Sequence, residues 1–139
     1  MNKKKVIIDF VGAINKQDIQ KIFTLMAEKF KFVDSQDNAY VGRVKMKEAW
    51  IKYFELFPNY KIKVDSLILN EDCYIAFGHA SGTLIKNGKL LKKNSWQIPA
   101  CWRSKVDNDL VSFWQVYADN SPVFEILKAN SSSENQLRK

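Results

Sequence analysis

The sequence is short of the residues that metal centres and disulfide scaffolds need. Its two cysteines, Cys73 and Cys101, lie singly in apolar segments, so we expect free buried thiols in a reducing compartment. Its single histidine, His79, cannot assemble a zinc site, which needs three or four ligands, and no other ligand spacing is present. Neither "HASG" nor "KNGK" has the spacing of a phosphate-binding loop. We therefore expect neither a metal nor an organic cofactor.

Long apolar runs are also missing. No segment approaches the roughly 20 apolar residues that span a bilayer. The start, "MNKKKVIIDF", places lysines before an apolar run, but Asp9 interrupts that run and no small-residue cleavage site follows. This pattern argues against a secretion signal. We expect a soluble protein of the cytoplasm that has no membrane partner.

The balance of charge is positive, with a formal net charge of +7. A basic protein raises the question of a nucleic-acid partner. The lysines are scattered, however, and they flank turns or alternate with apolar residues, as solvent-facing positions do. No zinc-finger spacing or aromatic RNA-binding signature accompanies them. Solvating charge is therefore favoured, and a polyanion-binding surface stays as the minor alternative.

Hydrophobic residues, by contrast, are plentiful enough for one well-packed domain: they make up 46% of the 139 residues. The first third has the spacing of helices. One helix is indicated by apolar residues from Ile7 to Ile14, and Asp18 is placed to cap a second that includes Met26. "FKFVD" then reads as a short strand. A third helix carries an apolar stripe from Met46 to Phe57 and is ended by Pro58.

After Pro58 the hydrophobic period changes to two, which predicts strands. A break of phase near Asp65 and Ser66 predicts a bulge, and "NG" at residues 87–88 predicts a hairpin turn. Strands continue to "LVSFWQVYA", and a short helix follows to about Lys128. We predict an α+β protein with a single domain over residues 1–129 and a disordered polar tail over residues 130–139.

The order of these segments resembles the nuclear-transport-factor-two-like superfamily, which includes ketosteroid isomerases and SnoaL-like polyketide cyclases. The residues that carry the likeness are "FVGAINKQDIQKIFTLMAEKFKFVD", "VGRVKMKEAWIKYFELFP", "GHASGTLI", "PACWRS" and "LVSFWQVYADN". The resemblance implies a cone-shaped α+β barrel of the cystatin-like kind. Three N-terminal helices would pack on a strongly curved, mainly antiparallel sheet around an apolar pocket. It also implies a homodimer formed through the outer face of the sheet.

The resemblance places Asp34 where the isomerases hold the base that moves a proton next to a ketone. A carboxylate facing an apolar pocket loses hydration, which raises its pKa toward a useful value. The alternative is a turn-forming role at the strand end, which "DSQDN" supports. The isomerases' oxyanion donors fall at Phe10 and Ala100, which have no donor, and this argues against ketosteroid isomerisation. The cyclases' late acidic residue corresponds to Asp119, for which a helix cap is the alternative.

Other candidates depend on which strand faces lie inside the cone, and the sequence leaves this open. His79 is either a pocket acid or base, or a histidine with a structural hydrogen bond or a place at a dimer surface. Trp96, Ile98, Ala100 and Trp102 share one face of a strand. A packed core and a ligand wall both fit that pattern. If the cone is hollow, the expected ligand-binding residues are Phe10, Tyr53, Trp96, Trp102 and Trp114.

The leading hypothesis is a small-molecule-binding SnoaL-like protein. It would hold an apolar or aromatic ligand in an aromatic-lined pocket, with possible isomerase-, cyclase- or hydrolase-like acid–base chemistry through Asp34 and His79. The alternative is a non-catalytic dimeric module of the same fold that mediates protein association. A hollow interior would favour the first hypothesis, and a solid interior the second.

Overall fold

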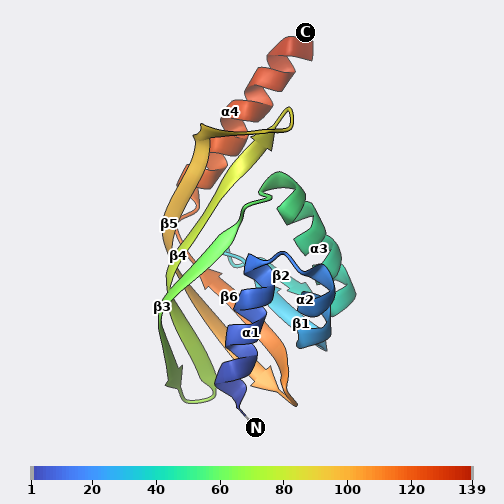
Figure 1. Cartoon of the computed structure of the whole chain (residues 1–139), viewed down its shortest axis with the longest axis vertical. Coiled ribbons are helices and arrows are strands. Elements are labelled where there is room, and N and C mark those ends of the chain that lie inside the picture. The colour runs from blue at the N-terminus through green and yellow to red at the C-terminus, as the bar shows by residue number, and fades with distance from the viewer. Residues whose placement is uncertain (1, 139) are drawn as a thin grey trace.

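Helices lie at both ends of the chain and six strands form one sheet between them, within residues 2–138, which the computed structural model describes (Figure 1). Side chains are described as far as residue 131. The helices are α1 (Lys3–Asn15), α2 (Ile19–Leu25), α3 (Arg43–Leu56) and α4 (Ser121–Arg138). The strands are β1 (Met26–Val33), β2 (Ala39–Val41), β3 (Lys61–Asn70), β4 (Cys73–Lys86), β5 (Lys89–Asp107) and β6 (Leu110–Tyr117).

The sheet has the strand order β2-β1-β6-β5-β4-β3. Only the β1–β6 pair is parallel, and the other four pairs are antiparallel. Figure 1 shows the long strands β3, β4 and β5 curving along one side, with α1, α2 and α3 on the other. The predicted α+β class, with helices packed on a mainly antiparallel sheet, is confirmed.

The first two helices form where the apolar spacing and the caps predict them. The predicted apolar face of α1 is buried, and the Asp18 side chain accepts a hydrogen bond from the Lys21 backbone N–H at 3.1 Å. That face consists of Ile7, Phe10, Val11 and Ile14. The second helix is shorter than predicted, because the backbone of Met26 is already extended and begins β1.

The irregularities predicted in the sheet are also present. The register of β3 against β4 shifts between Val64 and Ser66, where the phase of the sequence pattern breaks. Asn87 and Gly88 both have positive φ, 53° and 74°, which is the backbone of the tight turn that joins two twisted strands. Each of these features follows from local sequence alone.

The C-terminal helix is longer than expected: α4 continues to Arg138, past the predicted end near Lys128. Within α4, the Asn130 amide donates to the Ile126 carbonyl oxygen at 2.8 Å and to Asn94 Oδ1 of β5 at 3.2 Å, which ties the middle of the helix to the sheet. The division into a domain of residues 1–129 and a polar tail stays a prediction.

Candidate functional site

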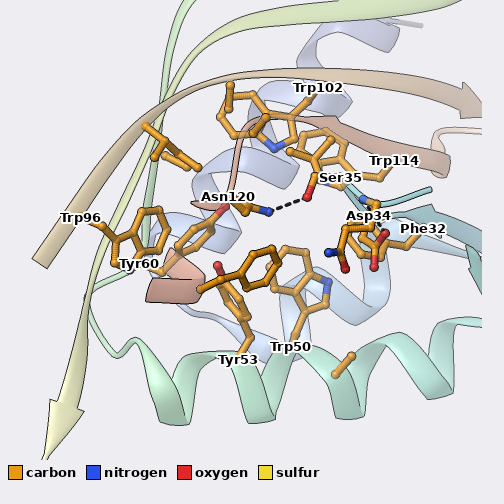
Figure 2. Close-up of a pocket in the computed structure, with 18 of the residues that line it drawn as sticks. Phe32, Asp34, Ser35, Trp50, Tyr53, Tyr60, Trp96, Trp102, Trp114 and Asn120 are labelled. Atoms are coloured by element: carbon orange, nitrogen blue, oxygen red, sulfur yellow. Dashed lines mark hydrogen bonds between the residues drawn. The ribbon is translucent and has the colours of Figure 1, made fainter. Parts of the chain in front are cut away.

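A cavity of about 280 Å³ lies between the inner face of the sheet and α3 (Figure 2). Its size is near the lower end of the range for small-molecule pockets, roughly 300–1,000 Å³. Its wall is mostly apolar and aromatic. The lining residues are Phe32, Asp34, Ser35, Gln36, Met46, Ala49, Trp50, Tyr53, Tyr60, Ala80, Trp96, Ile98, Ala100, Trp102, Trp114, Val116, Ala118, Asn120 and Phe124.

Strand alternation decides which residues of β5 reach this cavity. Trp96, Ile98, Ala100 and Trp102 are spaced by two residues, and all four line it. On the neighbouring strand, Ala80 pairs with Ile98 and presents only a methyl group. Because small residues stand beside the tryptophans, the rings leave an open space between them. The cone is therefore hollow.

The floor of the cavity comes from α3 and from the segment that follows it. Trp50 and Tyr53 lie three residues apart, on one face of the helix, and their rings meet edge to face at a centroid distance of 6.4 Å. The Tyr53 ring also meets that of Tyr60 at 5.0 Å, and Tyr60 meets Trp96 at 6.0 Å. Four aromatic residues thus form a continuous wall from α3 to β5.

Asp34 lies at the edge of the cavity, where β1 ends and a tight loop begins, and it is half-buried. Its Oδ1 accepts hydrogen bonds from the backbone N–H groups of Gln36 and Asn38 at 3.0 and 2.9 Å. Its Oδ2 accepts from the Asn38 side-chain amide at 3.2 Å and from the Tyr40 hydroxyl at 3.5 Å. The predicted turn-forming role is therefore present, and the same carboxylate borders the cavity.

Two predicted site residues do not line the cavity. Phe10 is fully buried behind it, against Phe30 and Trp114, because its helix face meets the closed part of the cone. His79 is on the outer face of β4, since its neighbour Ala80 points inward, and its Nδ1 lies 3.5 Å from Asp65 Oδ2. The alternation of β4 therefore places His79 outside this cavity. The structure does not bring it together with Asp34.

Several cavity residues were not predicted. Tyr60 lies immediately before β3 and borders the cavity. Ser35, Gln36 and Asn120 border the mouth from loops, and the Asn120 amide donates to Ser35 Oγ at 2.6 Å across 85 residues of sequence (Figure 2). No periodic pattern identifies loop residues of this kind. Their proximity arises from the parallel β1–β6 pair, which brings the two strand ends together.

Asp119, the second carboxylate of interest, lies at the start of the last helix, two residues before Ser121. Its Oδ1 accepts from the backbone N–H of Ser121 at 3.0 Å and from the Ser121 hydroxyl. These hydrogen bonds, from the hydroxyl first and then from the N–H, lower the pKa of Asp119. Asp119 does not line the cavity, so the cap is the interpretation that the geometry supports.

The cavity holds little charge. Among the described residues that line it, Asp34 is charged and none is lysine, arginine or histidine. Burial raises the pKa of Tyr53 and of Tyr60, so both phenols stay protonated at neutral pH. In the part of the chain that the structure describes, no three acidic, cysteine or histidine side chains gather as metal ligands would. The arrangement can exclude water, stack a flat ring and donate hydrogen bonds.

The helices and the curved sheet together surround an aromatic-lined cavity, which is the arrangement of a cone-shaped α+β fold. The chain belongs to the SnoaL-like domain family, whose model matches residues 7–120. No curated protein matches the sequence. None of the described helices is both long enough and apolar enough to cross a membrane.

Solved structures share this fold at low sequence identity. A candidate SnoaL-like polyketide cyclase from Shewanella denitrificans OS-217 matches with a TM-score of 0.77 and 14% identity, over 91% of this chain and 97% of that one. A similar candidate cyclase from Shewanella putrefaciens CN-32 has a TM-score of 0.77 and 16% identity, over 93% and 98%. A protein with a ketosteroid isomerase-like fold from Catenulispora acidiphila DSM 44928 has a TM-score of 0.72 and 13% identity, over 85% and 88%. These matches establish the fold.

Proposed function

We propose that the protein binds an apolar or aromatic small molecule in the cavity between α3 and the sheet. The observation that carries the proposal is the hollow itself: about 280 Å³ enclosed mainly by tryptophan, tyrosine and aliphatic side chains. Large rings that merely completed a core would close on one another, because protein interiors are packed as densely as organic crystals. Here alanines at Ala80 and Ala100 keep them apart.

Filling the cavity tests this proposal directly. Ala100→Phe adds a ring to the inner face of β5, and Gln97→Phe adds the same ring to the exposed outer face of the same strand. The measurement is quenching of tryptophan fluorescence by a panel of naphthalene and indole derivatives. We expect Ala100→Phe to abolish binding and Gln97→Phe to preserve it. If the unaltered protein binds no member of the panel at millimolar concentration, the proposal is wrong.

We propose Asp34 as the residue for acid–base chemistry in this cavity. This residue is the carboxylate that borders the cavity, and four hydrogen bonds hold it in one orientation. A bound ketone whose α-carbon reached Asp34 would transfer a proton to the carboxylate and take it back. NMR in deuterated water measures this as loss of the α-proton signal of a bound aryl methyl ketone. Exchange no faster with the protein than with Asp34→Asn would remove the catalytic part of the proposal.

We further propose that two copies pair through the outer face of the sheet. Phe77, Cys101 and Tyr117 are opposite one another on β4, β5 and β6, and Phe77 and Tyr117 are about half exposed. A row of apolar side chains on a sheet face is typical of an interface. This face also supports the second candidate function, a non-catalytic protein-association module, which the hollow cavity makes less favoured. Sedimentation should show a dimer that Phe77→Glu dissociates, and a monomer at all concentrations would refute the pairing.

The two cysteine thiols indicate the cellular compartment. Cys73 and Cys101 are both free, and free thiols persist in a reducing compartment such as the cytoplasm. We propose a cytoplasmic protein. Cell fractionation would test this, and recovery in an oxidising compartment would contradict it.

A further inference from the structure

The hairpin that joins β4 to β5 has a tip that is both basic and apolar. Its sequence, "KNGKLLKK" at residues 86–93, contains four lysines and two adjacent leucines. Residues 87–93 are all exposed, and Leu90 and Leu91 are 48% and 39% exposed. Figure 1 shows this hairpin in yellow beside α4, at the end of the molecule away from the N-terminus. We call residues 86–93 the basic hairpin.

The backbone of β5 explains why both leucines are exposed. Ile85 of β4 pairs with Leu90 of β5, and the next pair along the hairpin is Thr83 with Ser95. Residues 91–94 of β5 therefore stand opposite one residue of β4. Such a bulge breaks the alternation that would turn one of two adjacent side chains inward. Single exposed leucines are ordinary on protein surfaces, whereas this pair has lysines on both sides in the sequence.

The basic hairpin lies in a long stretch of the chain that has no acidic residue. Residues 73–106, which include all of β4 and nearly all of β5, contain neither aspartate nor glutamate. On the neighbouring helix α4, Glu125 borders a groove together with Lys93, so that lysine has a carboxylate nearby. Lys89 and Lys92 do not border this groove, and they supply the charge on which the inference depends.

A surface that combines cations with exposed hydrocarbon favours one kind of partner. A second copy of the hairpin would bring like charges together, which opposes pairing. The phosphates of a nucleic acid would attract the lysines but offer little apolar surface to the leucines. An anionic bilayer suits both kinds of side chain, because its headgroups attract lysine and its acyl boundary takes up leucine.

We propose that the basic hairpin is a docking surface for an anionic lipid bilayer, with its lysines at the headgroups and its two leucines at the boundary of the acyl chains. Binding at the surface needs no spanning segment. The lack of a long apolar run, from which we expected no membrane partner, therefore does not oppose it. The inference is independent of the proposed function, since the hairpin contributes no residue to the cavity.

Vesicle flotation tests the proposal on the whole protein. The probes are vesicles of phosphatidylcholine alone and vesicles of phosphatidylcholine and phosphatidylglycerol in equal parts. At about 0.1 M salt, where the screening length is about 10 Å, we expect binding to the anionic vesicles to be at least about tenfold tighter. Equal binding to both kinds of vesicle, or no binding to the anionic ones, would overturn the proposal.

Two double variants locate the contact on the hairpin. Lys89→Gln/Lys92→Gln should weaken binding to the anionic vesicles about 10- to 30-fold, because each lysine near such a surface contributes about fivefold. Leu90→Ser/Leu91→Ser keeps every charge and should weaken binding at least about threefold, because the apolar contact is lost. A leucine variant that binds as the unaltered protein does would indicate a purely ionic surface and overturn the bilayer as partner.

The matched control is Lys3→Gln/Lys4→Gln, which removes the same charge from the exposed start of α1, at the other end of the molecule (Figure 1). Its binding should change less than about twofold, since charges far from the contact are screened. A loss equal to that of the hairpin lysine variant would show attraction by net charge alone and overturn the docking surface. Tighter binding to a double-stranded DNA fragment than to the anionic vesicles, at the same salt, would do so in favour of a nucleic acid. The comparison of vesicles on the unaltered protein needs no variant, so a variant that does not fold leaves the proposal open to refutation.

Discussion

The interior of the cone has two parts built from the same kinds of residue, one solid and one hollow. In the solid part, Phe10 of α1 contacts Phe30 at a centroid distance of 6.0 Å and Trp114 at 5.1 Å, and all three are buried. In the hollow part, Tyr53 and Trp96 face open space. Aromatic stripes on amphipathic helices therefore do not by themselves make a core or a pocket. The side chains on the opposite wall determine whether such a stripe packs into a solid core or borders a cavity.

The largest expected effect separates the two parts. Phe10→Ala removes a fully buried ring from the solid part, and truncations of this kind cost about 3–5 kcal/mol of unfolding free energy. Tyr53→Phe in the hollow part removes only a hydroxyl and keeps the ring, so it should cost less than about 1 kcal/mol. Urea denaturation measures both. Similar losses in the two variants would contradict the division of the interior.

The next effect concerns the bend of the sheet along the hollow part. Gly78 of β4 pairs with Val64 beside the bulge of β3, and a Cβ atom on Gly78 would lie 1.8 Å from the Lys63 carbonyl oxygen. Gly78→Ala must push these strands apart, and we expect a loss of about 1–3 kcal/mol, as for other overpacked sites. Thermal unfolding measures it.

A second glycine provides the control for this variant. Gly12 lies inside α1, and nothing stands within 4 Å of a Cβ atom placed there. Gly12→Ala should stabilise the protein by about 0.5–1 kcal/mol, because alanine favours a helix. Equal changes of stability in the two alanine variants would contradict the expected clash between a Cβ atom at Gly78 and the neighbouring strand.

High pH should reveal the two buried tyrosines of the hollow part. Desolvation raises the folded-state pKa of Tyr53 and Tyr60 above the unfolded value of about 10. The folded protein therefore holds protons that the unfolded chain releases. The stabilisation that these two protonated side chains contribute is fully present below about pH 10 and is lost as the pH rises further. We expect phenolate absorbance from these two side chains to appear only with unfolding.

The matched control is the double variant Tyr53→Phe/Tyr60→Phe, which leaves three of the five tyrosines in place. Its alkaline unfolding should shift to higher pH, and the late step of phenolate absorbance should disappear. Ionisation of all five tyrosines in the folded protein, before any loss of structure, would show that the pair is accessible to solvent.

Local features of the fold could be predicted from the sequence because each follows from a few adjacent residues. The cap at Asp18, the bulge near Ser66 and the turn at Asn87 are of this kind. The site could be predicted only in part. Trp96 and Trp102 were predicted as a pair from strand alternation, but the sequence left open which face of β4 lies inside. One face of β4 has small residues and the other bears Phe77 and His79, so hydrophobicity favours the face that the structure places outside.

The small face of β4 is inside because the tryptophans of β5 need room beside them. The Gly82 backbone, for example, lies against the Trp96 ring, and a Cβ atom there would come within 3.0 Å of it. This is a property of two strands together and cannot be seen in either one. The mouth residues Ser35 and Asn120 escaped prediction for a related reason: the hydrogen bond between them joins distant loops.

The smallest expected effect on stability concerns Asp34, whose hydrogen bonds within its loop and whose proposed role in chemistry can be separated by one pair of variants. In Asp34→Asn, the side-chain oxygen can still accept the hydrogen bonds from the backbone N–H groups of Gln36 and Asn38, so the loop should keep its shape and lose less than about 1 kcal/mol. Asp34→Ala loses all four side-chain hydrogen bonds and should cost about 1–2 kcal/mol more. Chemical denaturation compares the stability of the two variants, and ligand titration measures binding in the cavity.

If Asp34 serves only the loop, Asp34→Asn should bind ligand and exchange α-protons as the unaltered protein does. If its charge takes part in chemistry, exchange should fall while binding and stability persist, and equal loss of all three would show that the loop itself had collapsed.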